Sequence, residues 1–154
     1  MTHRVDAKNE RQTWDVADTL AAVARPGDVI ALWGDLGAGK TAFARAFVNA
    51  ACGCEQEVPS PTFTLVQTYD APMAEIWHFD LYRLSSPDEA FELGIEVAFA
   101  DGISLIEWPD RLGAELPANR LDVTLEHVDA EDARTIRVRG HGTWEQRVRE
   151  ISFD

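Results

Sequence analysis

The sequence predicts an α/β fold in which a mixed central sheet is flanked by helices and runs parallel around a glycine-rich loop. Residues 28–34 (DVIALWG) have the length and apolar character of a buried strand. The glycine-rich loop follows, and residues 42–51 (AFARAFVNAA) then show the periodicity of a helix. Further strand-like and helical stretches continue through the 154 residues without a repeat or a linker. We therefore expect a single domain over residues 1–154.

The first two helices are predicted from apolar periodicity. One lies within residues 13–27 (TWDVADTLAAVARPG), with Thr13 or Asp15 as its cap and Pro26-Gly27 as its end. Its expected apolar face consists of Val16, Ala17, Leu20, Val23 and Ala24. The helix at 42–51 has Phe43, Ala46, Phe47 and Ala50 on a common face and is expected to run until Gly53.

The rest of the chain predicts five strands and two more helices. The strands are residues 63–70, 75–84, 103–108, 120–128 and 133–140, and the helices lie within 85–94 and 142–151. The first two of these strands are expected to form a hairpin around residues 71–74, and the last two to be antiparallel partners. For the helix at 85–94, Ser86 is the expected cap, Pro87 the first helical residue, Glu89 the capping-box partner and Gly94 the stop. Thr143 is the expected cap of the last helix.

The charge of the chain argues against a broad nucleic-acid surface. It has 27 acidic and 14 basic residues and a formal net charge of −13, whereas nucleic-acid binders need a basic footprint. One local phosphate site remains compatible with this charge, because backbone N–H groups can form it. The apolar runs are too short to cross a bilayer and the N-terminus does not resemble a signal peptide, so we expect a cytoplasmic protein.

The two cysteines, Cys52 and Cys54, do not predict a metal site or a disulfide framework. Two thiolates alone cannot complete a structural zinc site, and further ligands are missing nearby. We interpret them as reduced thiols at the end of a helix.

The loop Gly34–Thr41 (GDLGAGKT) matches the phosphate-binding pattern G-x-x-x-x-G-K-[ST] in full. Glycines let backbone N–H groups converge on phosphate oxygens, and the following helix adds the positive end of its dipole. Lys40 is expected to reach the β- and γ-phosphates, and the Thr41 hydroxyl to ligate Mg²⁺. The expected nucleotide-binding residues are Asp35, Leu36, Gly37, Ala38, Gly39, Lys40, Thr41 and Ala42. The strand before and the helix after the loop supply the context that the motif requires, so we predict a P-loop NTPase-like domain.

Two carboxylates are candidates for the chemistry at this loop. Asp80 and Glu107 both follow apolar runs, so each is expected at the carboxyl edge of the sheet, beside the phosphates. We assign Glu107 to Mg²⁺ and Asp80 to the attacking water, although the sequence leaves open which of the two ligates the metal. Thr62, in the loop SPTFTL, is a candidate γ-phosphate sensor.

Other residues near these carboxylates are candidates for supporting roles. Trp108, Arg83 and Arg111 are possible nucleotide or partner contacts, with a core position as the alternative for Trp108. The Asn-Lys-x-Asp motif of GTP-specific proteins is missing from the sequence, which favours ATP.

Four segments in this order, GDLGAGKT, SPTFTL, HFDLYRL and IEWPDRL, resemble the TsaE (YjeE) family. The resemblance covers Gly34–Leu112 with motifs and implies a slow Mg²⁺-dependent ATPase of tRNA threonylcarbamoyladenosine synthesis. It also implies that the TsaB and TsaD proteins bind and stimulate the ATPase, that the ATP cycle resets their complex, and that tRNA is handled only through them. Carried onto this sequence, Lys40 and Thr41 match the P-loop ligands and Thr62 the switch-like segment, while Asp80, Glu107 and Trp108 match the acidic residue and the Glu-Trp pair.

Two other functions remain open from the residues alone. A small-molecule kinase would share the P-loop but needs a lid, and no Arg-rich lid segment is evident in the sequence. A nucleotide-dependent adaptor would use ATP only to order a surface. Phosphate release with and without partners would separate these alternatives.

Overall fold

The computed structural model describes residues 2–35, 37–53 and 65–153, and within them the chain forms one seven-stranded sheet. The strands are β1 (Thr2–Ala7), β2 (Val29–Trp33), β3 (Val66–Asp70), β4 (Glu75–Asp80), β5 (Ile103–Glu107), β6 (Arg120–His127) and β7 (Arg134–His141). Their order across the sheet is β1-β7-β6-β2-β5-β4-β3. The neighbours β6–β2, β2–β5 and β5–β4 are parallel and the other pairs are antiparallel, which confirms the predicted mixed sheet.

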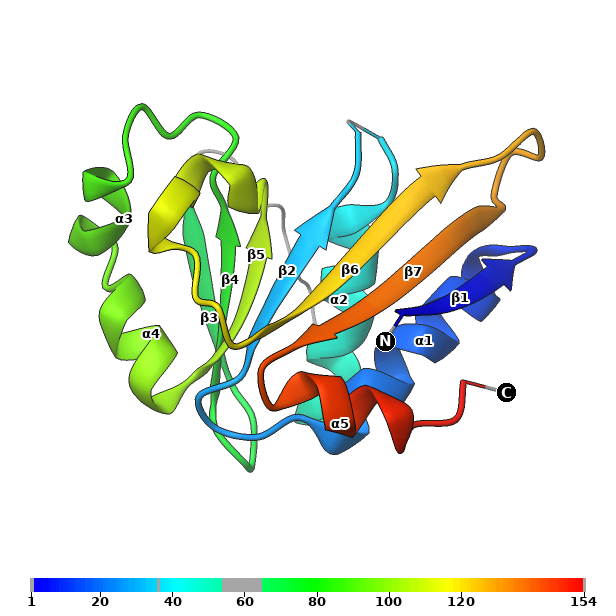
Figure 1. The fold of residues 1–154 in the computed structure, drawn as a ribbon, viewed down its shortest axis with the longest axis horizontal. Helices are drawn as coiled ribbons and strands as arrows, with labels where there is room; N and C mark the ends of the chain where they lie inside the picture. Colours follow the sequence, from blue (N-terminus) through cyan, green and yellow to red (C-terminus); the bar gives the residue numbers. More distant parts are fainter. Residues whose placement is uncertain (1, 36, 54–64, 154) are drawn as a thin grey trace.

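The parallel strands bring four carboxyl ends to one edge of the sheet. Figure 1 shows β2, β4, β5 and β6 pointing the same way, with the loop to α2 leaving from this edge. Both predicted antiparallel pairs, β3–β4 and β6–β7, are present. This edge is where ligands bind in open α/β sheets.

Helices cover the two faces of the sheet unequally. They are α1 (Glu10–Val23), α2 (Lys40–Cys52), α3 (Asp88–Glu92), α4 (Ile95–Asp101), the 3₁₀ helix η1 (Pro109–Glu115) and α5 (Trp144–Arg149). The larger core lies between the sheet and helices α1, α2 and α5, whereas α3 and α4 contribute to a smaller core. Figure 1 shows α3 and α4 beside β3 and β4, away from α1 and α2.

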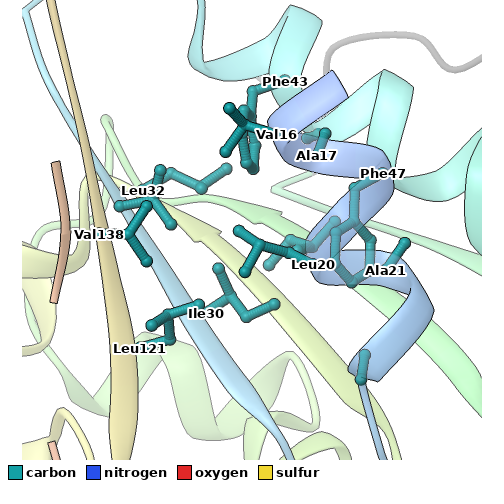
Figure 2. Packing of buried hydrophobic residues seen from close by; sticks show 14 of the residues in the cluster. Val16, Ala17, Leu20, Ala21, Ile30, Leu32, Phe43, Phe47, Leu121 and Val138 are labelled. Atoms are coloured by element: carbon teal, nitrogen blue, oxygen red, sulfur yellow. The ribbon is translucent and has the colours of Figure 1, made fainter. Parts of the chain in front are cut away.

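The larger core anchors the strand and helix that flank the P-loop. Leu20 of α1, Phe43 and Phe47 of α2, and Ile30 and Leu32 of β2 are fully buried in it, as Figure 2 shows. Fully burying one such side chain contributes about 1.5–3 kcal/mol. The core therefore holds β2 and α2 firmly on both sides of the loop that connects them.

The first two helices differ from the prediction in three details. Helix α1 begins at Glu10, and its cap is Asn9, whose side chain accepts a hydrogen bond from the Gln12 N–H, so the predicted cap at Thr13 or Asp15 is wrong. Val23 is 37% exposed, because the sheet-facing stripe of α1 ends at Ala21. In α2 it is Ala44 and Val48 that are buried with the two phenylalanines, while Ala50 is exposed.

The predicted cap of the helix at 85–94 is also wrong. Pro87 occupies the cap position of α3, the Ser86 side chain makes no capping hydrogen bond, and Glu89 accepts instead from the Ser85 N–H. The sequence patterns predict neither β1 nor α4. Thr143 does cap α5, but its hydroxyl is directed to Asn119 Oδ1, 3.0 Å away, rather than to the helix.

The described residues bear on the predictions about the cysteines and about membrane-spanning segments. Cys52 is the last residue of α2, and its thiol donates to the Asp70 carbonyl at 3.5 Å, whereas Cys54 lies outside the described residues. The described part of the chain contains no group of three or more His, Cys, Asp or Glu side chains that could hold a metal. None of its helices is both long and apolar enough to span a bilayer.

Candidate nucleotide-binding site

The P-loop leaves β2 at Gly34 and enters α2 at Lys40. Gly34 has φ +146°, and a Cβ there would lie only 2.6 Å from the Leu125 carbonyl oxygen, so the loop can pass β6 this closely only with glycine. Gly39 caps α2 in a left-handed conformation and has no side chain to bond the first helical N–H groups. These N–H groups have no partner within the helix and are left for a ligand.

A cleft of about 450 Å³ lies beside this loop. It is lined by Gly37, Gly39, Lys40, Thr41, Ala42, Asp80, Tyr82, Arg83, Glu107 and Trp108. Most of the predicted site residues therefore meet in one place. Asp35 and Ala38 lie outside this lining but form part of the loop, and Leu36 and Thr62 fall outside the described residues.

Lys40 is buried at the base of the cleft. Its ammonium group donates to the carbonyl oxygens of Gly34 (2.5 Å) and Asp35 (2.9 Å) and lies 4.1 Å from the centre of the Trp108 ring. Burial lowers the pKa of Lys40 below its ordinary value of 10.5, and the nearby carboxylates, Glu107 first among them, oppose that shift. The loop thus holds its one lysine in place by contacts that a phosphate group can replace.

Thr41 connects the P-loop to the end of β5. Its hydroxyl lies 3.0 Å from both carboxylate oxygens of Glu107. Glu107 is only 3% exposed, and its Oε2 also lies 2.6 Å from the Nε2 of the fully buried His78. A hydroxyl and a carboxylate brought together in this way are the kind of oxygen ligands that Mg²⁺ takes from proteins.

Asp80 is the neighbour of Glu107 across two parallel strands. The two residues are paired in the β4–β5 register, and Asp80 is 5% exposed. One of its oxygens, Oδ1, accepts a hydrogen bond from the Tyr82 N–H at 3.1 Å. Because Asp80 lines the cleft, it is a candidate to contact a water molecule or to be a second ligand of the metal.

Aromatic and basic side chains form one wall of the cleft. Trp108 packs against Tyr82 with the ring centres 4.9 Å apart, and the Arg111 guanidinium lies 5.9 Å from the Tyr82 ring centre. Trp108 adopts φ +58°, a left-handed conformation that is uncommon for a residue with a Cβ. Trp108 contacts the P-loop lysine directly, whereas Arg111 contacts Tyr82 of the cleft wall.

Comparison with known proteins gives the family of this chain. The family model described as "Threonylcarbamoyl adenosine biosynthesis protein TsaE" matches residues 7–136. The chain belongs to the TsaE family. It is 41% identical over 130 residues to the tRNA threonylcarbamoyladenosine biosynthesis protein TsaE of Rickettsia bellii, covering 84% of this chain and 90% of the relative. The protein of the same name from Bacillus subtilis is 38% identical over 129 residues, 83% of this chain and 79% of the relative.

A solved structure supports the same assignment. The crystal structure of Bacillus subtilis YdiB matches with a TM-score of 0.79 and 31% identity, covering 97% of this chain and 93% of that one. The mixed sheet with its P-loop is therefore the fold of this TsaE-family chain, as the sequence predicts.

Three residues at this TsaE site have no role in the sequence prediction: Tyr82 of the cleft lining, His78 and Arg134. His78 lies inside the segment HFDLYRL, where only Asp80 was a candidate, although a histidine two residues before a strand-end carboxylate is a usable signal. Arg134 of β7 donates from Nε to the Ala38 carbonyl of the P-loop at 2.8 Å. No local pattern points to Arg134, because its partner lies 96 residues away in the sequence.

Proposed function

We propose that this TsaE-family chain is a Mg²⁺-dependent ATPase that supports tRNA threonylcarbamoyladenosine synthesis by binding a TsaB–TsaD complex and resetting it between turnovers. The pathway is supported by family membership and by the names of the relatives. The ATPase activity rests mainly on one observation: the Thr41 hydroxyl of a complete P-loop faces both oxygens of the buried Glu107.

The cleft residues have different proposed roles, which we assign from the chemistry of their side chains. Thr41 and Glu107 would hold Mg²⁺, which supplies charge neutralisation at the phosphates when bound. Lys40 would exchange the carbonyl oxygens of Gly34 and Asp35 for phosphate oxygens, a change that returns a strong counter-charge to this buried ammonium group. Asp80 would orient the attacking water, because it lies on the neighbouring strand end and shares the cleft with Glu107.

We infer dependence on a partner from the small number of positive charges that the described cleft residues can place near the transition state. Besides Lys40, the described residues that line the cleft include one further cation, Arg83, and Arg111 contacts the Tyr82 ring of its wall. We propose that hydrolysis is slow in the isolated chain and that TsaB–TsaD completes the site. With a formal charge of −13, this chain would meet tRNA only through those partners.

The first experiment compares wild type with Lys40→Ala in ATP binding and in single-turnover phosphate release, with and without TsaB–TsaD. Removing the one lysine of the loop is expected to lower turnover by about 100-fold or more, the size of effect seen when one transition-state donor is lost. Lys8→Ala is the matched control, since Lys8 is exposed and is the other lysine of the chain. Undiminished hydrolysis by a folded Lys40→Ala protein would rule out the proposal, and phosphate recovered on a small molecule would point to a kinase.

A further inference from the structure

His78 is a buried histidine for which the proposed chemistry has no role. His78 lies on β4, is 0% exposed, and places Nε2 2.6 Å from Glu107 Oε2. A buried polar side chain costs free energy unless its hydrogen bonds are made. This contact is therefore a specific buried interaction and not an incidental surface pair.

The sheet itself directs the two side chains towards each other. Alternate residues of a strand share a face, so His78 and Asp80 of β4 lie on one face, and Leu105 and Glu107 of β5 share a face as well. The register pairs His78 with Leu105 and Asp80 with Glu107, which places all four on the same side. His78 and Glu107 are thus diagonal neighbours on two parallel strands, a position fixed by backbone hydrogen bonds.

The proposed role of Glu107 assigns the donor. A carboxylate that binds Mg²⁺ is ionised and can only accept, so His78 Nε2 is the donor in this contact. The other ring nitrogen, Nδ1, is buried and has no partner among the described residues. Nε2 is therefore the ring nitrogen of His78 that has a partner among the described residues.

Glu107 has a second contact, with a different element. The Thr41 hydroxyl reaches its two oxygens from α2, at 3.0 Å each, while His78 approaches Oε2 from β4. When the Thr41 hydroxyl turns to a metal, the hydrogen bond from His78 is independent of that movement. Hydrogen bonds from such outer partners orient metal-binding side chains, and their loss typically weakens metal affinity 10–100-fold.

We propose that His78 is a positioning residue that holds the Glu107 carboxylate in the orientation in which it binds Mg²⁺. This inference rests on the proposed function, since it assumes that Mg²⁺ binds with the nucleotide at Glu107. His78 touches neither nucleotide nor metal in this account, and its effect is transmitted entirely through Glu107.

The test measures ATP binding by titration calorimetry, with Mg²⁺ varied and with EDTA, in His78→Leu and His78→Gln. His78→Leu is expected to raise the Mg²⁺ concentration at half-saturation by about 10–100-fold and to leave metal-free ATP affinity within about twofold. His78→Gln should recover most of the loss, because its amide nitrogen stands where Nε2 stood. Ser104→Ala is the control, as Ser104 is equally buried on β5 and its hydroxyl makes no hydrogen bond within the described residues.

A second measurement separates this inference from the proposed function. In ¹⁵N-imidazole NMR of the nucleotide-free protein, His78 should show a protonated Nε2 whose signal shifts on Glu107→Gln. If wild type lacks Mg²⁺-dependent ATP binding, the proposed function fails while the NMR result still decides the contact. If His78→Leu does not fold, His78→Asn, whose amide is too short to reach Glu107, replaces it in the comparison with His78→Gln. Wild-type Mg²⁺ dependence in a folded Leu or Asn variant, or an Nε2 without a proton, would overturn the inference.

Discussion

At the scale of single residues, Glu107 and Asp80 are adjacent carboxylates with different surroundings. Glu107 is contacted by the Thr41 hydroxyl and by His78, whereas Asp80 Oδ1 accepts from the backbone N–H of Tyr82. The side chain next to the P-loop threonine is the better placed of the two to share a metal with it. This difference supports the assignment of Glu107 to Mg²⁺ and Asp80 to water, which the sequence left open.

Conservative amide substitutions separate these two roles. Glu107→Gln is expected to raise the Mg²⁺ concentration required for ATP hydrolysis, because an amide oxygen is a weaker metal ligand than a carboxylate. Asp80→Asn is expected to lower kcat with little change in nucleotide affinity, as for a group that acts mainly in the transition state. Steady-state kinetics at varied Mg²⁺ would check both, and reversed phenotypes would exchange the two assignments.

Lys40 predicts a pH dependence of stability in the nucleotide-free protein. Burial lowers its pKa from 10.5, so between the lowered pKa and 10.5 the unfolded chain binds more protons than the folded one. The buried charge therefore lowers the free energy of unfolding by its full amount below this pH window, and this destabilisation is relieved as pH rises through the window. The free energy of unfolding of wild type, relative to Lys40→Met, should increase with pH up to about 10.5.

Urea unfolding at a series of pH values measures this difference. Lys8→Met is the control for the loss of one positive charge, because Lys8 is exposed. A wild-type to Lys40→Met difference that is independent of pH would contradict the prediction.

At the scale of elements, the short helix α5 is joined to the rest of the fold by Arg147. The guanidinium group makes two hydrogen bonds to Asp28, at 2.7 and 2.9 Å, and a third to the Val23 carbonyl at the end of α1. It also lies 3.6 Å from the ring centre of Trp144 in its own helix. One side chain thereby connects α5, the end of α1 and the entry to β2.

Removing this connection should destabilise the whole fold. Arg147→Leu leaves the Asp28 carboxylate, 8% exposed, without its cation, and breaking such a pair costs about 3 kcal/mol in the free energy of unfolding. Arg149→Leu in the same helix should cost about 0.5 kcal/mol or less, because the Arg149–Glu145 pair is exposed. Chemical denaturation of both variants checks the contrast, and equal losses would show that Arg147 has no special role.

At the scale of the whole molecule, the net charge of −13 bears on how a partner docks. An acidic surface attracts a basic partner surface, and such contacts weaken as salt screens them. If TsaB–TsaD stimulates ATP hydrolysis as proposed, the stimulated rate should fall more steeply with ionic strength than the basal rate. Initial rates at about 50 and 300 mM salt would measure this, and parallel declines would show that charge does not assist docking.

The P-loop, its flanking strand and helix, and the family all follow from the amino-acid sequence alone. The P-loop and its flanking elements are local features, since the glycine spacing, the apolar strand and the apolar helical period all lie within residues 28–53. The family resemblance depends on four short segments within residues 34–112. Patterns of this kind can be read from the sequence because they reflect the backbone preferences and burial of residues that lie close together in the chain. Asp80 and Glu107 could be placed at the same edge because the carboxyl ends of parallel strands meet there.

Which side chains meet at that edge depends on the tertiary fold. Thr41 and Glu107 are 66 residues apart, His78 and Glu107 are 29 apart, and Arg134 reaches the P-loop across 96 residues. The same holds for β1, a half-exposed edge strand (THRVDA) that is a strand because β7 supplies its backbone hydrogen bonds. No local propensity encodes such contacts, since they depend on strand order and register, which are settled by how the whole chain buries its apolar faces.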